Sequence, residues 1–285
     1  MNTLKEVLME AQKLLASVTD QSRLEAELLL CHSLKISREE LLRRALETPK
    51  PSVLKEFQQL LQRRLQGEPI AYIIECKEFY GRNFKVSPSV LIPRPDSEVL
   101  IEASLEVLRP EATPQILDLG GGSGCLGQTL LCEHNGATLT TVDISPEATF
   151  IAQENAKNLS LLQRIRFLTC SIEQLNSLSF PTPFDLVIAN PPYIANADPD
   201  IHQEVHKSEP HIALYSGDSG LEAFHTWIPL ALEVTRPKGH VIFEIGWQQA
   251  SSVEKIFLNT NLVSWVKIIK DLAGHQRALL AQKKS

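Results

Sequence analysis

The sequence has 285 residues, of which 43% are hydrophobic and 22% charged, a composition typical of a globular protein long enough to form two domains. Its formal net charge of -6 is uneven, because residues 1–68 hold 11 basic and 10 acidic side chains whereas the remainder holds 17 and 24. An acidic larger part argues against a nucleic-acid substrate, whose phosphates need a cationic surface.

Apolar residues form no membrane-spanning pattern in the sequence. In the first helix-like segment the charged residues Lys5, Glu6, Glu10 and Lys13 interrupt the apolar ones, so we expect neither a signal peptide nor a membrane span there. No later stretch approaches the roughly 18 apolar residues that a span requires. The five cysteines lack C-x-x-C spacing, which argues against a disulfide framework and a cysteine zinc site. We therefore expect a protein of the reducing cytoplasm with no membrane partner.

Residues 1–75 are predicted to form a small helical bundle. Apolar residues recur at helical spacing over residues 4–15 and again over residues 53–61. Thr3 and Glu6 have the S/T-x-x-E spacing of a capping box, in which each residue satisfies a backbone N–H of the other. The bundle contains no motif for chemistry, so we expect it to dock a substrate.

Residues 76–95 are predicted to be a β-hairpin connector, because they are rich in aromatic and β-branched residues and are punctuated by glycine and proline. Over residues 96–285, short β-rich runs alternate with helical patterns, which predicts an α/β fold whose parallel sheet is covered on both faces. Its strands are expected near residues 115–119, 138–143, 165–169, 184–189 and 240–245. Two further runs, LVSWVKIIK and RALLAQ, have no helix between them and predict an antiparallel pair appended to the sheet.

The first strand of this sheet runs directly into a glycine-rich loop, Gly120-Gly121-Gly122-Ser123-Gly124, at the start of a helix. Such a loop lets a ligand approach the backbone N–H groups closely. Asp143 lies nineteen residues after the loop, at the end of the second strand, where a carboxylate can accept hydrogen bonds from both hydroxyls of a ribose. The loop and Asp143 together predict a nucleoside site at the carboxyl ends of the strands.

The loop alone leaves the identity of the nucleoside open. Gly122-x-Gly124-x-x-Gly127 satisfies the dinucleotide fingerprint, so an NAD-dependent oxidoreductase is an alternative. The longer spacing Asp118-x-Gly120-x-Gly122-x-Gly124 resembles the first motif of the seven-stranded S-adenosylmethionine (SAM) methyltransferases. No candidate for hydride chemistry stands out elsewhere, which favours the methyl donor.

A later strand ends in the sequence IANPPY, residues 188–193. Proline has a fixed φ and no N–H, so the strand must stop at Asn190 and continue as a rigid turn through Pro191 and Pro192. The Asn190 side-chain oxygen and the Pro191 carbonyl can accept the two N–H bonds of a planar NH2 group, which orients its nitrogen and favours the positive charge that develops during methylation. The ring of Tyr193 can pack on the flat face of that group. We interpret the turn as a holder for an amide or aromatic amine near a methyl donor.

Along nearly its whole length the sequence resembles the bacterial peptide chain release factor glutamine N5-methyltransferases, the HemK/PrmC family. The Asn-Pro-Pro-Tyr turn is shared with nucleic-acid amino-methyltransferases, whereas FYG followed by LIPRP looks particular to the protein-glutamine group. The resemblance rests on GEPIAYI, EFYGRNFKV, VLIPRPDSE, ILDLGGGSGCLG, FDLVIANPPYI, SEPHIALYSGDSGLEAF and FEIGWQQ.

The resemblance implies SAM as the cofactor, S-adenosylhomocysteine as its product, and the glutamine of the Gly-Gly-Gln tripeptide in class I release factors as the substrate. It implies that a seven-stranded Rossmann-like methyltransferase domain, residues 96–285, follows the helical bundle. Carried over by position, it assigns the cofactor to Gly120, Gly121, Gly122, Ser123, Gly124, Asp143, Ile144, Ile172 and Asn190. It assigns the glutamine to Asn190, Pro191, Pro192 and Tyr193, and it places Pro93 and Arg94 near the donor pocket.

The sequence departs from the family at two positions. Gly121 stands where the family commonly has threonine, which should loosen the loop slightly but keep its backbone donors. Cys170-Ser171-Ile172 stands where relatives often carry an acidic residue, so the contact to the adenine edge is open, and Ile172 is expected to sandwich the ring.

Other candidate sites carry less weight. His202 and His206 are four residues apart with His211 nearby, but the glutamate between them is misplaced for H-E-x-x-H, so no metal site is predicted. Glu244 is a carboxylate in an apolar strand, so it should be paired or have a raised pKa, and it supports either the active-site turn or a neighbouring loop. Two alternative functions stay open: an amino-methyltransferase acting on nucleic acid or on a ribosomal-protein glutamine, and an NAD-dependent oxidoreductase.

Overall fold

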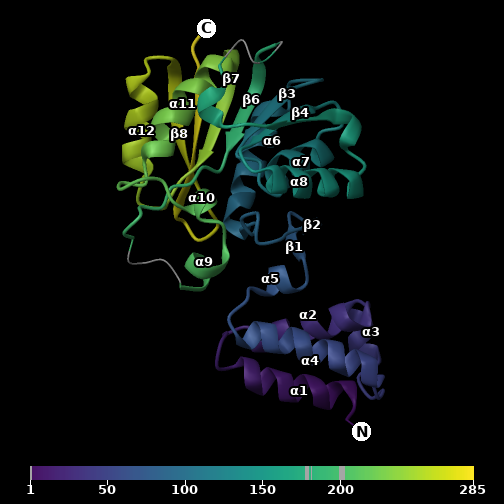
Figure 1. Cartoon of the computed structure of the whole chain (residues 1–285). Helices are drawn as coiled ribbons and strands as arrows, with labels where there is room; N and C mark the ends of the chain where they lie inside the picture. The colour runs from purple at the N-terminus through teal and green to yellow at the C-terminus, as the bar shows by residue number, and fades with distance from the viewer. Residues whose placement is uncertain (1, 177–179, 181, 199–202) are drawn as a thin grey trace. The chain divides into compact units, whose positions relative to one another are not determined.

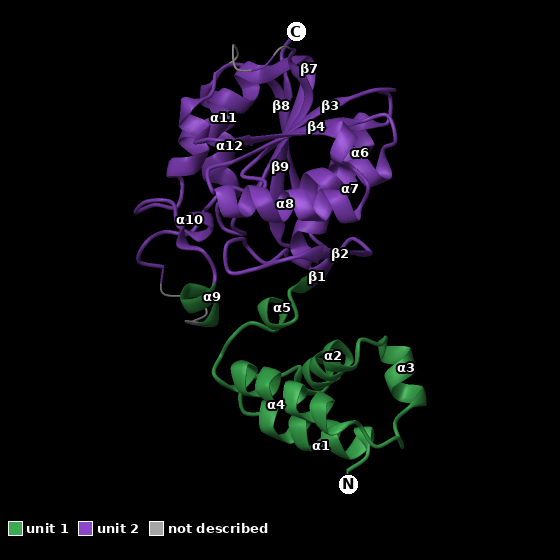
Figure 2. Cartoon of the chain, turned by 45° about the vertical axis from the view of Figure 1, so that its right-hand side comes forward, with its two compact units in different colours: residues 1–76, 202–208 green, residues 77–201, 209–285 purple. Residues whose placement is uncertain are grey.

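The computed structural model describes residues 2–176, 180, 182–198 and 203–285. The chain divides into two compact units, residues 1–76 with 202–208 and residues 77–201 with 209–285 (Figure 2). Across these described ranges, no helix is both long enough and apolar enough to cross a membrane.

The first unit consists of helices around an apolar core that includes Leu15, Leu29 and Leu30. The predicted capping box is confirmed at its first helix, since the Glu6 N–H donates to the Thr3 hydroxyl and the Thr3 N–H donates to the Glu6 carboxylate at 2.7 Å. The helices are α1 (Leu4–Leu15), α2 (Ser22–Leu34), α3 (Arg38–Arg43), α4 (Pro51–Leu65), α5 (Ile70–Ile73) and α9 (Gln203–Ser208).

A buried ion pair ties the helices of this unit together. Arg64 on α4 is only 4% exposed, and its Nε lies 2.7 Å from a carboxylate oxygen of Glu25 on α2. The same guanidinium lies 3.1 Å from Glu204 on α9, a later segment that also belongs to the first unit. Because a buried guanidinium without a partner is costly, both carboxylates contribute to holding α4 in place.

The second unit is built on a seven-stranded sheet in the order β5-β4-β3-β6-β7-β9-β8 (Figure 1). The first five strands in this order pair in parallel, and β9 pairs antiparallel with both β7 and β8, as the sequence predicted. The strands are β3 (Gln115–Leu119), β4 (Thr138–Asp143), β5 (Ile165–Thr169), β6 (Phe184–Ala189), β7 (Thr235–Glu244), β8 (Val263–Lys270) and β9 (Gln276–Lys283), and a separate two-stranded sheet comprises β1 (Cys76–Phe79) and β2 (Arg82–Lys85).

Helices cover both faces of the large sheet, with α6, α7 and α8 on one face and α11 and α12 on the other (Figure 1). Successive strand residues face opposite sides, so Ile116 packs with the first group and Leu117 with the second. The helices are α6 (Glu98–Leu108), α7 (Cys125–Glu133), α8 (Pro146–Asn158), α10 (His211–Leu214), α11 (Glu222–Val234) and α12 (Ala250–Asn259), with short 3-10 turns at Pro95–Ser97, Leu162–Arg164 and Ile172–Gln174.

One strand is longer than the sequence indicates. The prediction places it near residues 240–245, whereas β7 begins at Thr235. Pro237 and Gly239 read as a turn, but Thr235 pairs with Phe184 of β6 before the register shifts. An irregularity in the ladder therefore accommodates the proline within the strand.

The strand order fixes the place of a ligand site. From β3 the chain proceeds outward through β4 to β5, and it then returns to β6 on the other side of β3. At such a reversal, the loops after the two central strands run in opposite directions and leave a crevice at their carboxyl ends. In this protein those loops begin at Gly120, after β3, and at Asn190, after β6.

Candidate active site

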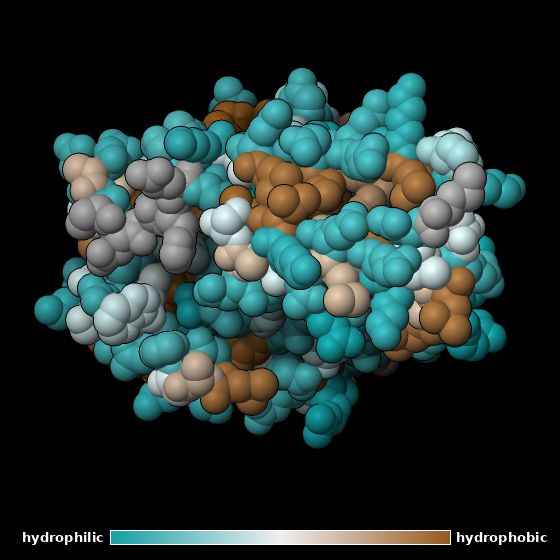
Figure 3. Space-filling model, turned by 90° about the horizontal axis from the view of Figure 1, so that it is seen from below, coloured by the Kyte–Doolittle hydropathy of each residue, from teal (hydrophilic) through white to brown (hydrophobic). Residues whose placement is uncertain are grey.

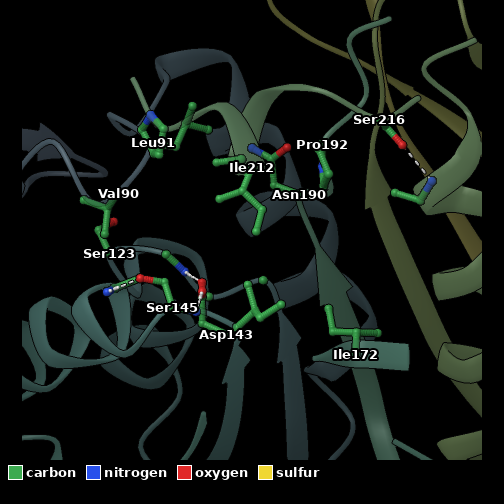
Figure 4. Close-up of a pocket in the computed structure, with 18 of the residues that line it drawn as sticks. Val90, Leu91, Ser123, Asp143, Ser145, Ile172, Asn190, Pro192, Ile212 and Ser216 are labelled. Carbon is green, nitrogen blue, oxygen red and sulfur yellow. Dashed lines mark hydrogen bonds between the residues drawn. The ribbon is translucent and has the colours of Figure 1, made fainter. Parts of the chain in front are cut away.

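A cavity of about 380 Å³ opens at this crevice, within the second unit (Figure 4). This volume falls in the range of about 300–1,000 Å³ that is usual for small-molecule sites. The residues of the sequence-based assignment that line it are Gly120, Gly121, Gly122, Ser123, Asp143, Ile144, Ile172, Asn190, Pro192, Pro93 and Arg94. Three loops that are far apart in the sequence thus meet in one cavity.

The glycine loop is fixed to the end of β4. The N–H groups of Gly120 and Gly121 both donate to the Val142 carbonyl, at 2.8 and 3.0 Å. Gly120 has a φ of +71°, and a Cβ built there would lie 2.9 Å from the ring of Trp227. Glycine is required at this position both by its conformation and by the close approach of that ring. Gly124, with a φ of +81°, ends the loop as the N-cap of α7 and does not line the cavity.

Asp143 lines the cavity, and the backbone orients both of its carboxylate oxygens. The Gly122 N–H donates to Oδ2 at 2.8 Å, and the Ser145 N–H donates to Oδ1 at 2.9 Å (Figure 4). Burial raises the pKa of Asp143 above its ordinary value. Each carboxylate oxygen has a second lone pair, so Asp143 can still accept hydrogen bonds from a diol.

A second carboxyl group lies beneath the loop and out of the cavity. Asp118, the penultimate residue of β3, is 1% exposed and accepts a hydrogen bond from the Gly127 N–H at 3.2 Å. Burial raises the pKa of Asp118 to about 7. Asp118 therefore fixes the start of α7 to the end of β3 rather than contacting a ligand.

Apolar side chains form the part of the cavity beyond Asp143. Ile144 is 49% exposed, and Ile172 is buried at the start of the turn that follows β5 (Figure 4). Ser171 and Glu173, on either side of Ile172, also line the cavity. Two apolar side chains beside a carboxylate that can accept hydrogen bonds from a diol suit the flat base of a nucleoside.

The Asn-Pro-Pro-Tyr turn presents only part of its length to the cavity. Asn190 and Pro192 line it, whereas Pro191 and Tyr193 are not among the described residues that do (Figure 4). The Tyr193 hydroxyl instead donates to the Glu244 carboxyl group at 3.2 Å. Of the two roles considered for Glu244, this contact favours support of the active-site turn.

Several cavity residues were not assigned from the sequence. Trp227 on α11 and five residues of the segment 210–216 also line the cavity. Glu209, which is 4% exposed, accepts a hydrogen bond from the Ile92 N–H at 3.1 Å and forms an ion pair with Arg94. Glu209 thereby joins two segments that each contribute lining residues, Pro93 and Arg94 from one and Pro210 from the other. The short motifs LIPRP and SEPHIAL were the only sequence signal for it.

The described residues contain no group of three or more histidine, cysteine, aspartate or glutamate side chains that could hold a metal ion. His202, one of the histidines considered for a metal site, lies outside the described residues.

Comparison with known proteins identifies two matching families. Residues 6–74 match the family described as PrmC N-terminal domain, and residues 96–213 match the family described as Methyltransferase small domain. The chain is 38% identical over 284 residues to the release factor glutamine methyltransferase of Koribacter versatilis, and 37% identical over 285 residues to that of Moorella thermoacetica. Each alignment covers 99% of this chain and 99% of the relative.

A solved structure shows the same fold at low sequence identity. A methyltransferase from Pyrococcus furiosus has a TM-score of 0.51 and 14% identity, and the match covers 80% of this chain and 100% of that one. At this identity the similarity concerns the fold alone.

Proposed function

Because the chain belongs to the family of release factor glutamine methyltransferases, we propose that it transfers a methyl group from SAM to the side-chain amide nitrogen of a glutamine in a peptide chain release factor. The family identified from the sequence motifs is confirmed by the comparisons. The observation that carries the proposal is that the glycine loop, Asp143 and Asn190 line one cavity.

The donor half of the cavity fits a nucleoside with a charged tail. The carboxylate of Asp143 is set to accept from the ribose hydroxyls, and Ile144 and Ile172 border the adenine. The loop from Gly120 to Ser123 brings the backbone close to the amino-acid part of the donor. When bound, SAM supplies a methyl group on a positively charged sulfur. The chain's own residues have to position the glutamine nitrogen that accepts this methyl group.

The acceptor half lies at Asn190. Its side-chain oxygen accepts one N–H of the substrate amide, which orients the nitrogen lone pair and favours the positive charge that develops as the new C–N bond forms. The nitrogen gains one methyl group and loses one proton in the complete reaction. The Asn190 amide neither gains nor loses a proton by ionising near neutral pH, so its role is orientation rather than acid–base catalysis.

We assign docking of the protein substrate to the first unit. None of its described residues lines the cavity, yet two of its large apolar side chains, Leu42 and Leu46, are 65% and 82% exposed. On the face of the molecule drawn in Figure 3, apolar side chains gather in patches among hydrophilic ones. Replacing Leu42 and Leu46 by aspartate should raise KM for the release factor and leave S-adenosylhomocysteine affinity unchanged.

The test of the proposed function compares candidate substrates directly. The purified chain is incubated with SAM carrying a radioactive methyl group and with a release factor, a ribosomal protein and DNA in parallel. Label in a glutamine of the release factor alone is the expected result. Label in either of the others would reassign the substrate, and calorimetric binding of NAD rather than SAM would reassign the reaction. A release factor acts during translation, so we place the enzyme in the cytoplasm.

A further inference from the structure

The segment 243–249, with the sequence FEIGWQQ, lies against the Asn190–Tyr193 turn although it takes no part in the cavity. Its strand, β7, pairs in parallel with β6, and Phe243 is opposite Ala189, the last residue before Asn190. Glu244 follows Phe243, is 1% exposed, and accepts the hydrogen bond of the Tyr193 hydroxyl. A buried carboxyl group thus meets the side chain that ends the turn.

Gln249 contacts the main chain of the same tyrosine. Its Nε2 donates to the Tyr193 carbonyl at 2.9 Å and to the Gly220 carbonyl at 3.2 Å, while its Oε1 accepts from the Gly246 N–H at 3.0 Å. Both ends of this amide are therefore engaged. Gly220 has a φ of +72°, and a Cβ built there would lie 2.5 Å from the Tyr193 carbonyl oxygen, so the surroundings of that carbonyl are tightly packed.

The next residue of the turn is fixed on its other side. The Ile194 N–H donates to the Leu214 carbonyl at 3.0 Å, and the Ile194 carbonyl accepts from the Ser216 N–H at 2.8 Å. The turn therefore leaves the cavity between two supports, the segment 243–249 and the segment 214–216. Only the first of these contacts Tyr193 at both its hydroxyl and its carbonyl.

Burial also sets the protonation of the two side chains. It raises the pKa of Tyr193, so the hydroxyl keeps its proton and remains a donor. It raises the pKa of Glu244 as well, which favours a neutral carboxylic acid. A glutamine side chain has nearly the same shape as that acid and can accept the same hydrogen bond.

We propose that Glu244 and Gln249 are positioning residues for methyl transfer: they fix Tyr193 at its hydroxyl and its carbonyl, and thereby hold the Asn190 amide at the distance the reaction needs. Tyr193 then acts through its hydroxyl as an anchor of the turn, not only through its ring. This inference rests on the proposed function, because the reaction whose geometry it explains is the methylation of a glutamine amide.

The test uses the full chain and single-turnover methylation of a release factor at saturating SAM, since this rate constant does not depend on the fraction of folded enzyme. Glu244→Leu and Gln249→Leu should each lower the rate constant about 10- to 100-fold, the scale expected when a reacting group is displaced by about 1 Å. Affinity for S-adenosylhomocysteine should stay within about twofold of the parent's, which also shows that each variant is folded. Gln248→Leu is the matched control, because Gln248 is exposed and undergoes the same chemical change one residue away.

Two further variants separate the hydrogen bond from packing. Glu244→Gln keeps an acceptor for the tyrosine and should retain the rate within about threefold, whereas Tyr193→Phe keeps the ring and should lose as much as Glu244→Leu. Combining Tyr193→Phe with Glu244→Leu should cost nothing beyond either change alone. A parental rate in Tyr193→Phe or in Gln249→Leu, or an equal loss in Glu244→Gln and Glu244→Leu, would overturn the proposal. If the parent itself does not methylate the release factor, the proposed function has failed instead.

Discussion

Replacing Gly121 by alanine should strain the glycine loop through a single contact with Thr141. The φ of Gly121 lies outside the left-handed region that Gly120, Gly122 and Gly124 occupy, so this angle does not by itself require glycine. A Cβ built at Gly121, however, would lie 2.1 Å from the Oγ1 of Thr141 on β4. Thr141 is only 4% exposed, so its hydroxyl would have to turn or shift within buried surroundings to make room for the new Cβ.

The cost follows from the distance. The two atoms must separate by at least about 1 Å to reach ordinary contact, and the Gly121 backbone is tied at both ends, by its N–H to Val142 and by its carbonyl to the Gly124 N–H. Overpacking of this kind usually costs about 1–3 kcal/mol. The free energy of unfolding should fall by that amount. The affinity for S-adenosylhomocysteine should fall about tenfold, which corresponds to about 1.4 kcal/mol of binding free energy.

The assay is a double-mutant cycle read by denaturant unfolding and by calorimetric titration of S-adenosylhomocysteine. Thr141→Ala removes the hydroxyl, so Gly121→Ala should be milder in that background by about 1 kcal/mol or more. Gly122→Ala is the control: its φ is +53° and the nearest atom to a built Cβ is 3.9 Å away, so Thr141→Ala should not relieve it. The steric reasoning is refuted if Gly121→Ala is neutral, or if its cost is the same with and without the Thr141 hydroxyl.

Three other predictions concern buried or cavity-lining charges. Asp143→Ala should weaken S-adenosylhomocysteine binding by about 1–3 kcal/mol, as for the loss of a charged hydrogen-bonding group, and an unchanged calorimetric Kd would show that the ribose lies elsewhere. Arg64→Met leaves Glu25 buried without its ion pair, so the first unit should lose about 3–5 kcal/mol of stability and melt earlier, while an unshifted thermal transition would contradict this. The folded-state pKa of Asp118 is raised to about 7, so between about pH 4 and 7 the folded protein keeps a proton that the unfolded chain releases. The free energy of unfolding should therefore fall as pH rises through this range, by up to about 1.4 kcal/mol per pH unit. Asp118→Asn should remove this slope in urea unfolding, and equal slopes in both proteins would count against the raised pKa.

The sequence predicts the fold of the second unit well, because its signals are local. Each strand from β3 to β6 is a short apolar run bounded by a helical pattern, and LVSWVKIIK and RALLAQ lack a helix between them. The convergence of the glycine loop, Asp143 and Asn190 also follows from the pattern. Parallel strands end at one edge of the sheet, so loops that follow adjacent strands must lie together.

The side chains opposite these loops could not be predicted in the same way. Trp227 lies on α11 with no motif around it, and its approach to Gly120 depends on how that helix packs on the sheet. Thr141 gives no local signal either, because it lies on β4 and meets Gly121, in the loop after β3, only when the two strands pair. The expectation that glycine at position 121 loosens the loop stays a prediction, and the structure adds that the Thr141 hydroxyl occupies the space that a side chain at Gly121 would need.

The role of Tyr193 shows a further limit. From the sequence, a tyrosine after two prolines is a natural partner for a flat substrate group. In the structure its hydroxyl is bound to Glu244 and its carbonyl to Gln249, about fifty residues further along the chain. Glu244 and Gln249 could be recognised as partners of Tyr193 only from the pairing of β6 with β7.

Asn190 offers the most direct test of the central claim. Asn190→Ala removes the side-chain oxygen that is proposed to orient the substrate amide, and Asn190→Asp keeps an acceptor but adds a carboxylate that must be desolvated or protonated. Single-turnover methylation of the release factor should fall in the order parent, aspartate, alanine, with alanine slower by roughly 10²- to 10³-fold and S-adenosylhomocysteine affinity retained in all three. An alanine variant as fast as the parent would mean that Asn190 only ends strand β6, and the assignment of the turn to methyl transfer would be wrong.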